Sequence, residues 1–383
     1  MIQTAILLSD PDISTAELAA VGAVLQSPQL SGGGPATAEF ESAFARYTGR
    51  AHAIAVSSGT LGVLLALKAY GIGRDDEVIA SPHSWREAAH AIALSGATPR
   101  FADIDYWAGT LSPQKAEARI TPKTRAIIAG NANGHPAPWN EFRELAGRRG
   151  LVLIEDSTEA IGSVYGGRRV GGFGDCAVFD FSQPGPLVCG EGGMIVTDDD
   201  TIASQLRGLR THRTKERSSE VAGASAPYAA VMSDVAAALG LEQLRRIDGI
   251  LARRKRTERL YFKYVKSFEG IKDPYVAPGV DEIHWFLYLA QLGARFSRSS
   301  RDAIVDDLKT EGIQAAPYSV PLHLQSCYIE MGCRRGDFIT AEKISDRAVA
   351  LPFHGHLDED QIAFVVGTLK DASTNVGAGS AIY

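Results

Sequence analysis

The sequence predicts an α/β fold in which a large, mostly parallel sheet of seven strands is followed by a smaller C-terminal α+β region. Between residues 36 and 197, stretches with a helical apolar period alternate with short apolar runs typical of buried strands. Such alternation favours a parallel sheet covered by helices on both faces. The chain has 383 residues, 45% of them apolar, which is enough for a large core and a second lobe.

The first expected helix carries Phe40, Phe44 and Tyr47 on one face and ends at Gly49, because glycine favours the backbone conformation that closes a helix. A buried strand at residues 52–56 follows it. Six more apolar runs of strand length complete the expected sheet, at residues 77–80, 99–102, 126–129, 151–154, 176–179 and 193–197.

A long helical stretch from Ser233 to Arg254 separates this sheet from a second region that mixes strands and helices. We therefore expect a large domain at residues 1–250 and a small domain at 251–370. Residues 371–383 are rich in glycine, alanine and serine without an apolar period, so we expect a mobile tail there.

Composition argues against several classes of partner. The net charge is −6, and the single basic run, residues 253–256, lies among helix formers, so we interpret it as a solvated helix face rather than a nucleic-acid site. No apolar run approaches the length of a membrane span or of a signal peptide, which predicts a cytoplasmic protein without a membrane partner. The four cysteines lack metal-binding spacing, so we expect buried thiols and no metal site.

A series of short motifs then recurs in a recognisable order. The chain carries Ser-Gly-Thr at 58–60, Ile-Glu-Asp at 154–156, Phe-Asp-Phe-Ser-Gln-Pro-Gly from 179 and Gly-Glu-Gly-Gly-Met from 190, then Met-Ser-Asp at 232–234 and Pro-Leu-His-Leu at 321–324. On these motifs the chain resembles, over nearly its whole length, the DegT/DnrJ/StrS family of PLP-dependent sugar aminotransferases. The resemblance implies a fold-type I aminotransferase-like fold and a homodimer with its active sites at the subunit interface.

The resemblance also assigns roles to residues of the cofactor cleft. Ser58, Gly59 and Thr60 join a strand to a helix where the family holds the PLP phosphate, and a helix amino end suits an anion. Asp156 ends a strand at the position where, in the family, a carboxylate pairs with the pyridine nitrogen of PLP. Trp85 stands at the position where an aromatic ring stacks on the cofactor. Each also has a purely structural interpretation, as a turn, a helix cap and a core aromatic.

Departures from the family pattern gather around the same cofactor. Gly185 stands where the resemblance expects the lysine that forms the Schiff base and moves the proton, and no lysine occurs between Lys123 and Lys215. Asp180 replaces a phosphate-binding serine, which brings a carboxylate toward a dianion. Glu159 replaces a glutamine that meets the phenolic oxygen, and an asparagine that reaches the phosphate is lost near residue 229. PLP binding is therefore doubtful.

The altered pocket is expected to gather Asp156, Glu159, Asp180 and His83, with Ser182 where the family often has histidine. Crowded carboxylates raise each other's pKa, so that one of them stays protonated and acts as an acid beside an ionised base.

His323 and His354 match positions near the substrate channel of the family. Each is equally compatible with a hydrogen-bonded histidine of the small lobe.

These features predict a biosynthetic enzyme that does not transaminate and carries out acid–base chemistry without PLP. Cyclisation, isomerisation, dehydration or condensation of a small polar or sugar-like intermediate of secondary metabolism fits the residues. Two alternatives stay open. One is a sugar dehydratase-like enzyme that holds PLP or PMP non-covalently, and the other is a catalytically silent partner of an active paralogue or another pathway protein.

Overall fold

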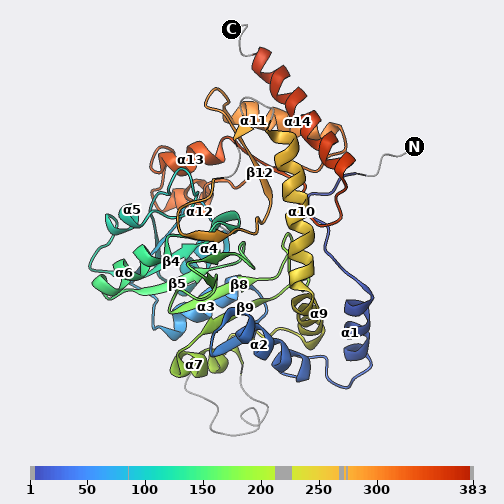
Figure 1. The fold of residues 1–383 in the computed structure, drawn as a ribbon. Helices are drawn as coiled ribbons and strands as arrows, with labels where there is room; N and C mark the ends of the chain where they lie inside the picture. Colours follow the sequence, from blue (N-terminus) through green and yellow to red (C-terminus); the bar gives the residue numbers. More distant parts are fainter. Residues whose placement is uncertain (1–4, 85, 212–226, 267–270, 273–274, 380–383) are drawn as a thin grey trace.

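The computed structural model describes residues 5–84, 86–211, 227–266, 271–272 and 275–379. It consists of a larger lobe built on a seven-stranded sheet and a smaller lobe built on a four-stranded sheet. The long helix α10 (Ile247–Val265) runs from one lobe to the other, shown in yellow in Figure 1. The predicted α/β class is confirmed.

The large sheet has the strand order β1-β9-β8-β5-β4-β2-β3. Strand β9 runs antiparallel to both of its neighbours, and the remaining neighbours pair in parallel. All seven strands predicted from the sequence are confirmed. Their bounds are β1 (His52–Val56), β2 (Glu77–Ala80), β3 (Thr98–Phe101), β4 (Thr124–Gly130), β5 (Val152–Asp156), β8 (Cys176–Asp180) and β9 (Gly193–Thr197).

Helices bury both faces of this sheet, as the near-continuous apolar strands require. Along β1, Ile54 and Val56 join the core beneath α3, α4 and α7, whereas Ala53 and Ala55 join the opposite core beneath α2 and α9. The helices of the large lobe are α1 (Thr15–Leu25), α2 (Pro35–Thr48), α3 (Gly59–Ala69), α4 (Arg86–Ser95), α5 (Pro113–Glu117), η1 (Ala132–Gly134), α6 (Trp139–Arg149), α7 (Asp200–Arg210) and α9 (Asp234–Arg245).

The small lobe packs its antiparallel sheet, in the order β10-β12-β14-β13, against helices α10, α11 and α14. A three-stranded sheet, β11-β6-β7, joins the lobes at a second point. The remaining elements are β6 (Val164–Tyr165), β7 (Arg168–Arg169), β10 (Ile271–Lys272), β11 (Val280–Glu282), β12 (Tyr288–Leu292), α11 (Arg298–Thr310), β13 (Ala316–Pro317), η2 (Leu322–Leu324), α12 (Ser326–Glu330), α13 (Ile339–Ser345), β14 (Ala348–Leu351) and α14 (Glu359–Gly379).

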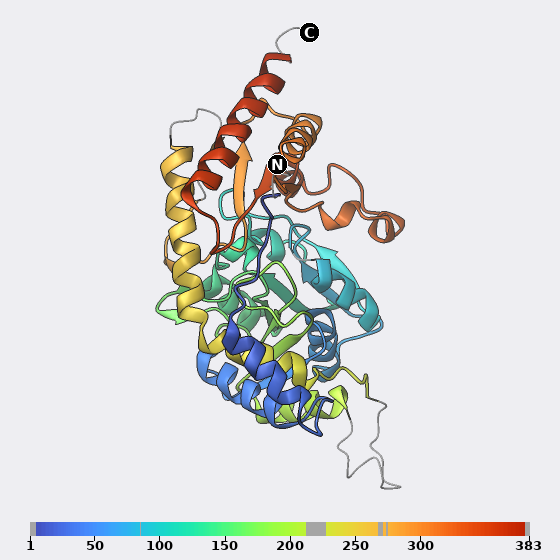
Figure 2. The same cartoon turned by 90° about the vertical axis from the view of Figure 1, so that its right-hand side faces the viewer.

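Segments near both ends of the chain contact the small lobe. Helix α14 continues to Gly379, so the first part of the expected tail is helical; Ala372 and Ser373 are buried and Val376 packs against the small-lobe core. Near the first described residues, Ile6 forms a bridge to Ile313 of the small lobe (Figure 2). The expected boundary at residue 250 falls within α10.

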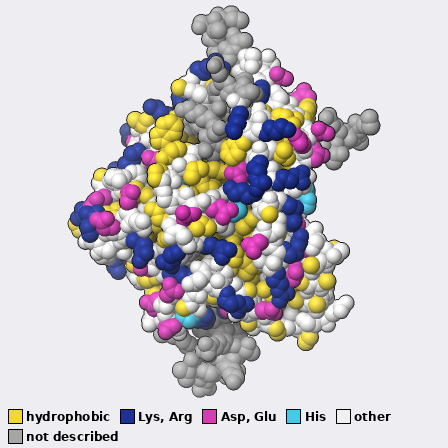
Figure 3. Space-filling view, in the orientation of Figure 1, with side chains coloured by type: hydrophobic (Ala, Val, Ile, Leu, Met, Phe, Trp, Pro, Cys, Tyr) yellow, Lys and Arg dark blue, Asp and Glu magenta, His cyan; other side chains and the backbone are white. Residues whose placement is uncertain are grey.

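Charge is mixed on the molecular surface. On the face shown in Figure 3, lysine and arginine side chains are interspersed with acidic ones, and no continuous basic surface suited to nucleic acid lies on it. Within the ranges that the structure describes, no helix is both long enough and apolar enough to cross a membrane.

One residue of the basic run on α10 corrects the sequence interpretation. Arg254 is buried, and its guanidinium donates hydrogen bonds to the carbonyl oxygens of Phe353, Trp285 and Phe286 at 3.0, 2.9 and 2.7 Å. Burial lowers its pKa to about 10. Arg254 therefore fastens two small-lobe loops to α10, whereas Arg256 of the same run is exposed as expected.

Replacing Arg254 by methionine is expected to lower the free energy of unfolding by about 3 kcal/mol, because three buried carbonyl oxygens lose their donor. Denaturant unfolding measures the change. Arg259→Met, at an exposed position of the same helix, is the matched control and is expected to change stability by less than about 0.5 kcal/mol. Equal effects of the two substitutions would contradict this role of Arg254.

Candidate active site at the lobe junction

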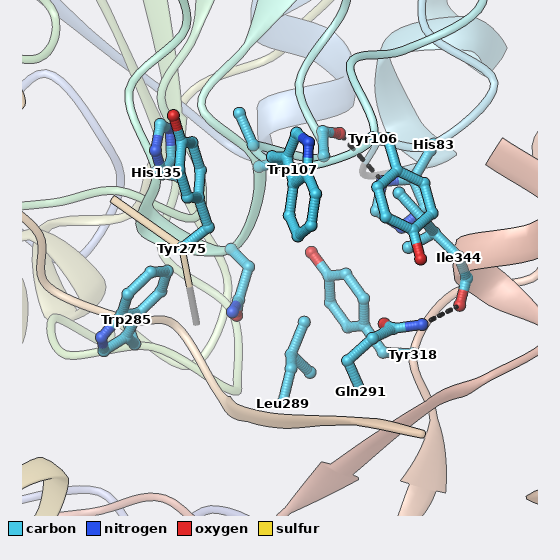
Figure 4. Close-up of a pocket in the computed structure, with 14 residues that line it drawn as sticks. His83, Tyr106, Trp107, His135, Tyr275, Trp285, Leu289, Gln291, Tyr318 and Ile344 are labelled. Atoms are coloured by element: carbon cyan, nitrogen blue, oxygen red, sulfur yellow. Dashed lines mark hydrogen bonds between the residues drawn. The ribbon is translucent and has the colours of Figure 1, made fainter. Parts of the chain in front are cut away.

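A cavity of about 120 Å³ lies between the carboxyl ends of the parallel strands and the small lobe (Figure 4). Loops that follow β2, β3 and β4 form one wall, and strand β12 with the segment after β13 forms the other. Ligands of open α/β sheets bind at such carboxyl ends. The fold therefore marks this junction as the candidate active site.

The amino end of α3 lies in the adjoining part of the large lobe. Ser58 caps this helix, since its hydroxyl oxygen accepts a hydrogen bond from the amide of Leu61 at 3.2 Å, and Thr60 is half-buried in the first turn. The amide of Gly59, the first residue of α3, has no acceptor within the helix. It donates a hydrogen bond to a carboxylate oxygen of Asp180 at 2.6 Å. An internal anion thus occupies the end of the helix dipole that the sequence analysis assigned to a phosphate.

Asp180 is held on its other oxygen as well. That oxygen accepts a hydrogen bond from the amide of Ser182 at 2.8 Å and another from the Ser182 hydroxyl. The residue is only 7% exposed. Both oxygens of the carboxylate are therefore fixed by donors of its own chain.

Gly59 is required for this arrangement. A Cβ atom at residue 59 would lie 2.8 Å from the Cβ and 2.9 Å from a carboxylate oxygen of Asp180. Separations below 3.0 Å force one of the two groups to move, so the contact between helix and carboxylate depends on the missing side chain.

Gly185 lies between β8 and β9 in a different environment. A Cβ atom there would lie 3.5 Å from the carbonyl oxygens of Ser182 and Leu187 and 3.9 Å from the ring of Phe286, all ordinary contacts. Packing at the Cβ position therefore permits a side chain, and the structure gives no steric reason for glycine.

Asp156 and Glu159 border one small cavity of about 10 Å³ that Asp180 does not line. Asp156 accepts a hydrogen bond from the amide of Thr158 at 3.1 Å. Glu159 accepts hydrogen bonds from the amide of Asn133 at 2.5 Å and from the hydroxyl of Tyr318 at 2.6 Å. Asp156 and Asp180 lie near the ends of the neighbouring strands β5 and β8, where Asp156 pairs with Val178.

Glu159 links the two lobes through these contacts. Asn133 has a φ of 49°, an uncommon conformation for a residue other than glycine, and its side-chain oxygen accepts a hydrogen bond from the amide of Leu287. Tyr318 comes from the small lobe, and burial together with the charge of Glu159 raises its pKa well above the usual value. The phenol therefore stays protonated as a donor to Glu159.

His83 has an unpaired ring nitrogen on the cavity wall. It is 4% exposed, and its Nδ1 lies 3.1 Å from the carbonyl oxygen of Gly109. Because a carbonyl only accepts, Nδ1 carries the hydrogen and Nε2 is an acceptor, for which the described residues supply no partner. Burial lowers the pKa of His83, so the ring is neutral at pH 7.

The remaining predicted site residues lie elsewhere. His323 is fully buried with its Nε2 3.0 Å from a carboxylate oxygen of Glu342, and neither His323 nor His354 is among the described residues that line the cavity. Ser182 donates hydrogen bonds to Asp180 through its amide and its hydroxyl. Trp85 lies outside the described residues. In the part of the chain that the structure describes, no group of three or more histidine, cysteine, aspartate or glutamate side chains is placed to hold a metal ion.

Sequence reasoning missed most of the aromatic wall of the cavity. The missed residues come from separate segments and share only an aromatic side chain: Tyr106, Trp107, His135, Tyr275, Trp285 and Tyr318. The adjacent pair Tyr106-Trp107, shortly after the strand predicted at residues 99–102, was the one available signal, since large exposed aromatics in a loop mark binding surfaces.

A two-lobed chain with this sheet and a cleft at its carboxyl edge defines the class of fold-type I aminotransferase-like proteins. The chain belongs to the DegT/DnrJ/EryC1/StrS aminotransferase family, which it matches over residues 11–370. It is 34% identical to the spore coat polysaccharide biosynthesis protein SpsC of Bacillus subtilis, over 94% of this chain and 95% of that protein. It is 36% identical to the GDP-perosamine synthase of Caulobacter vibrioides, over 86% and 88% of the two chains.

Solved structures agree with this assignment. The putative sugar aminotransferase Spr1654 from Streptococcus pneumoniae, in its PMP form, superimposes with a TM-score of 0.92 at 25% identity, covering 98% of this chain and all of that one. DesV of S. venezuelae, in complex with a ketimine intermediate, gives a TM-score of 0.89 at 30% identity, covering 97% and 99%. The fold predicted from the sequence resemblance is confirmed.

The contact between Gly59 and Asp180 gives a stability prediction. Gly59→Ala is expected to lower the free energy of unfolding by about 1–3 kcal/mol, because the new methyl group overlaps the carboxylate. Gly208→Ala is the matched control in helix α7, where nothing lies within 4 Å of the added Cβ, and it is expected to raise stability by about 0.5–1 kcal/mol. A stabilised Gly59→Ala variant in denaturant unfolding would show that Asp180 lies elsewhere.

Proposed function

We propose that this chain is a biosynthetic enzyme that does not transaminate and does not use PLP, and that it carries out acid–base chemistry on a small intermediate at the lobe junction. Cyclisation, isomerisation, dehydration and condensation are the reactions that need no electron sink. The observation that carries the proposal is the carboxylate of Asp180 at the amino end of α3. The named relatives in polysaccharide and GDP-perosamine synthesis support a biosynthetic context.

The residues present do not fit PLP. A phosphate at α3 would compete with the Asp180 carboxylate for the amide of Gly59 and would face its charge, a repulsion of roughly 1 kcal/mol in water-like surroundings and several in a partly buried site. Gly185 supplies no amine for a Schiff base. The missing Schiff-base amine at Gly185 and the Asp180 carboxylate at the phosphate site both weaken PLP binding in this proposal.

We assign the role of general base to His83. Its neutral ring offers Nε2 as an acceptor on the cavity wall, and the carbonyl of Gly109 fixes the tautomer and the ring orientation. A substrate hydroxyl or acidic C–H that reaches Nε2 loses its proton there. Because burial lowers the pKa of His83, the base stays unprotonated at neutral pH.

Glu159 acts in this scheme as a positioning residue. Through Asn133 and Tyr318 it fixes two segments of the cavity wall, and it keeps the Tyr318 phenol oriented. Asp156 borders the same small cavity as Glu159 and supplies a second carboxylate at the junction. Asp180 keeps the helix end closed to external anions.

The proposal is tested by adding PLP to purified protein and to two variants. Wild type is expected to show neither the absorption of a Schiff base nor amino transfer to a keto sugar. Gly185→Lys is expected to fold, since the added Cβ makes only ordinary contacts, and to bind PLP weakly. Adding Asp180→Ser is expected to tighten PLP binding by at least about tenfold, because it removes the competing charge.

Gly185→Met, similar in length but without an amine, is the matched control for the new side chain. The proposal is falsified if wild type is isolated with PLP and transfers amino groups. Tight PLP binding by Gly185→Lys alone would show that Asp180 does not obstruct the phosphate site.

We also propose that the chain is a cytoplasmic homodimer. Helix α1 supports the dimer, since Leu18 and Leu25 are 67% and 59% exposed there, and Leu30 beyond it is exposed too. Sedimentation at micromolar concentration is expected to show a dimer that Leu18→Asp weakens. Ile339→Asp, which adds the same charge on the small lobe, controls for a general effect of charge; a monomeric wild type would contradict the proposal.

A further inference from the structure

We propose that Asp105 is a positioning residue for the base: it holds the turn whose Gly109 carbonyl keeps the hydrogen of His83 on Nδ1 and leaves Nε2 as an acceptor at the cavity. Asp105 does not itself line the cavity and acts through the backbone. The inference deepens the proposed function, because it rests on the assignment of His83 as the base and names the residue that prepares it.

Residues 104–111 form a turn between β3 and α5. At its base, the amide of Asp105 donates a hydrogen bond to the carbonyl oxygen of Thr110 at 2.9 Å. At its tip, one carboxylate oxygen of Asp105 accepts hydrogen bonds from the amides of Trp107 and Ala108, both at 2.8 Å. Aspartate holds turns in this way because its short side chain reaches the amides that follow it.

Gly109 ends the tip of this turn beside His83. Its φ of 71° lies in the left-handed region that favours glycine, and its amide donates to the carbonyl oxygen of Asp105 at 3.1 Å. Its own carbonyl oxygen lies 3.1 Å from Nδ1 of His83. In Figure 4, Tyr106 and Trp107 of the same turn lie along the same edge of the cavity as His83. The turn that Asp105 holds therefore reaches the histidine ring directly.

The other groups around His83 leave its tautomer open. The Ser81 hydroxyl contacts only the backbone of His83, where it accepts from the amide and donates to the carbonyl oxygen. The Tyr318 ring meets the imidazole edge to face, with 5.5 Å between centroids, and its hydroxyl donates to Glu159. Asp103 acts on the ring through its charge. The carbonyl of the turn is thus the one hydrogen-bond partner that another described residue gives the ring.

This partner decides where the hydrogen of the neutral imidazole lies. Since a carbonyl oxygen only accepts, it selects the Nδ1–H form. A hydrogen bond of ordinary net strength corresponds to about a fivefold to tenfold preference. Without the carboxylate of Asp105, the amides of Trp107 and Ala108 lose their acceptor directly before Gly109. We therefore expect the carbonyl to lose its fixed position and the preference to fall.

The test is ¹⁵N NMR of the imidazole nitrogens in the full-length protein, without cofactor or substrate, at about pH 8, where an unperturbed histidine is neutral. The shifts of the two ring nitrogens report which one carries the hydrogen. His83→Gln identifies the signals of His83 among the nine histidines of the chain. Wild type is expected to carry the hydrogen on Nδ1, and Asp105→Ala is expected to reduce this preference by about fivefold or more.

Two further variants separate positioning from a general effect on the fold. Asp105→Asn keeps an oxygen acceptor for the same two amides and is expected to restore the wild-type shifts of His83. Asp358→Ala is the matched control, because Asp358 is also exposed and accepts a hydrogen bond from an amide, that of Gln361, beside the start of α14. It is expected to leave the shifts of His83 unchanged.

Three results would overturn the inference: a wild-type His83 that carries the hydrogen on Nε2, unchanged His83 shifts in Asp105→Ala, or an Asp105→Asn variant that matches Asp105→Ala. If Asp105→Ala fails to fold by circular dichroism, hydrogen exchange in wild type decides. The amides of Trp107 and Ala108 are then expected to exchange more slowly than that of Tyr106, and equal rates would overturn the inference.

Failure of this inference and failure of the proposed function are separate outcomes, because the NMR measurement needs neither turnover nor PLP. Unchanged shifts in Asp105→Ala would remove Asp105 from the scheme and leave His83 as the base. Full turnover of an identified substrate by His83→Gln would remove the base and leave the tautomer result standing.

Discussion

The function proposed for this chain depends on the contact between the Asp180 carboxylate and the amide of Gly59. A helix amino end in a cleft is an anion site, and here the chain fills it with its own side chain at 2.6 Å. The arrangement depends on glycine at residue 59, where a Cβ would overlap the carboxylate, and on Ser182, which holds the other oxygen. This carboxylate stands where the family resemblance expects a phosphate.

A second set of buried polar contacts holds the two lobes together at their junction. Arg254 fastens small-lobe loops to α10, and Glu159 joins Asn133 of the large lobe to Tyr318 of the small one. These contacts fix the walls of the cavity on which His83 presents its unpaired nitrogen. The described lining of this cleft at the sheet edge is rich in aromatic side chains and contains no lysine, arginine, aspartate or glutamate.

The sequence predicted the large sheet well because its strands are short apolar runs buried on both faces, as the opposite cores around Ile54 and Ala55 illustrate. It did not predict the burial of Arg254, because a run of basic residues is typical of a solvated helix face. The carbonyl oxygens that bind its guanidinium come from residues distant in the sequence. Helix α14 was missed beyond residue 371 because small residues conceal its packing against the lobe.

For the site, the motifs located Asp180 and Glu159 but not their partners. The crowding of the three carboxylates stays a prediction. The structure adds their partners, the amide of Gly59 for Asp180 and the hydroxyl of Tyr318 for Glu159. A crystal structure of the protein crystallised with excess PLP tests whether Asp180 keeps phosphate away from α3. We expect an oxygen of Asp180 to remain within hydrogen-bond distance of the Gly59 amide with no phosphate there; a phosphate bound to that amide, with Asp180 turned away, would contradict this proposal.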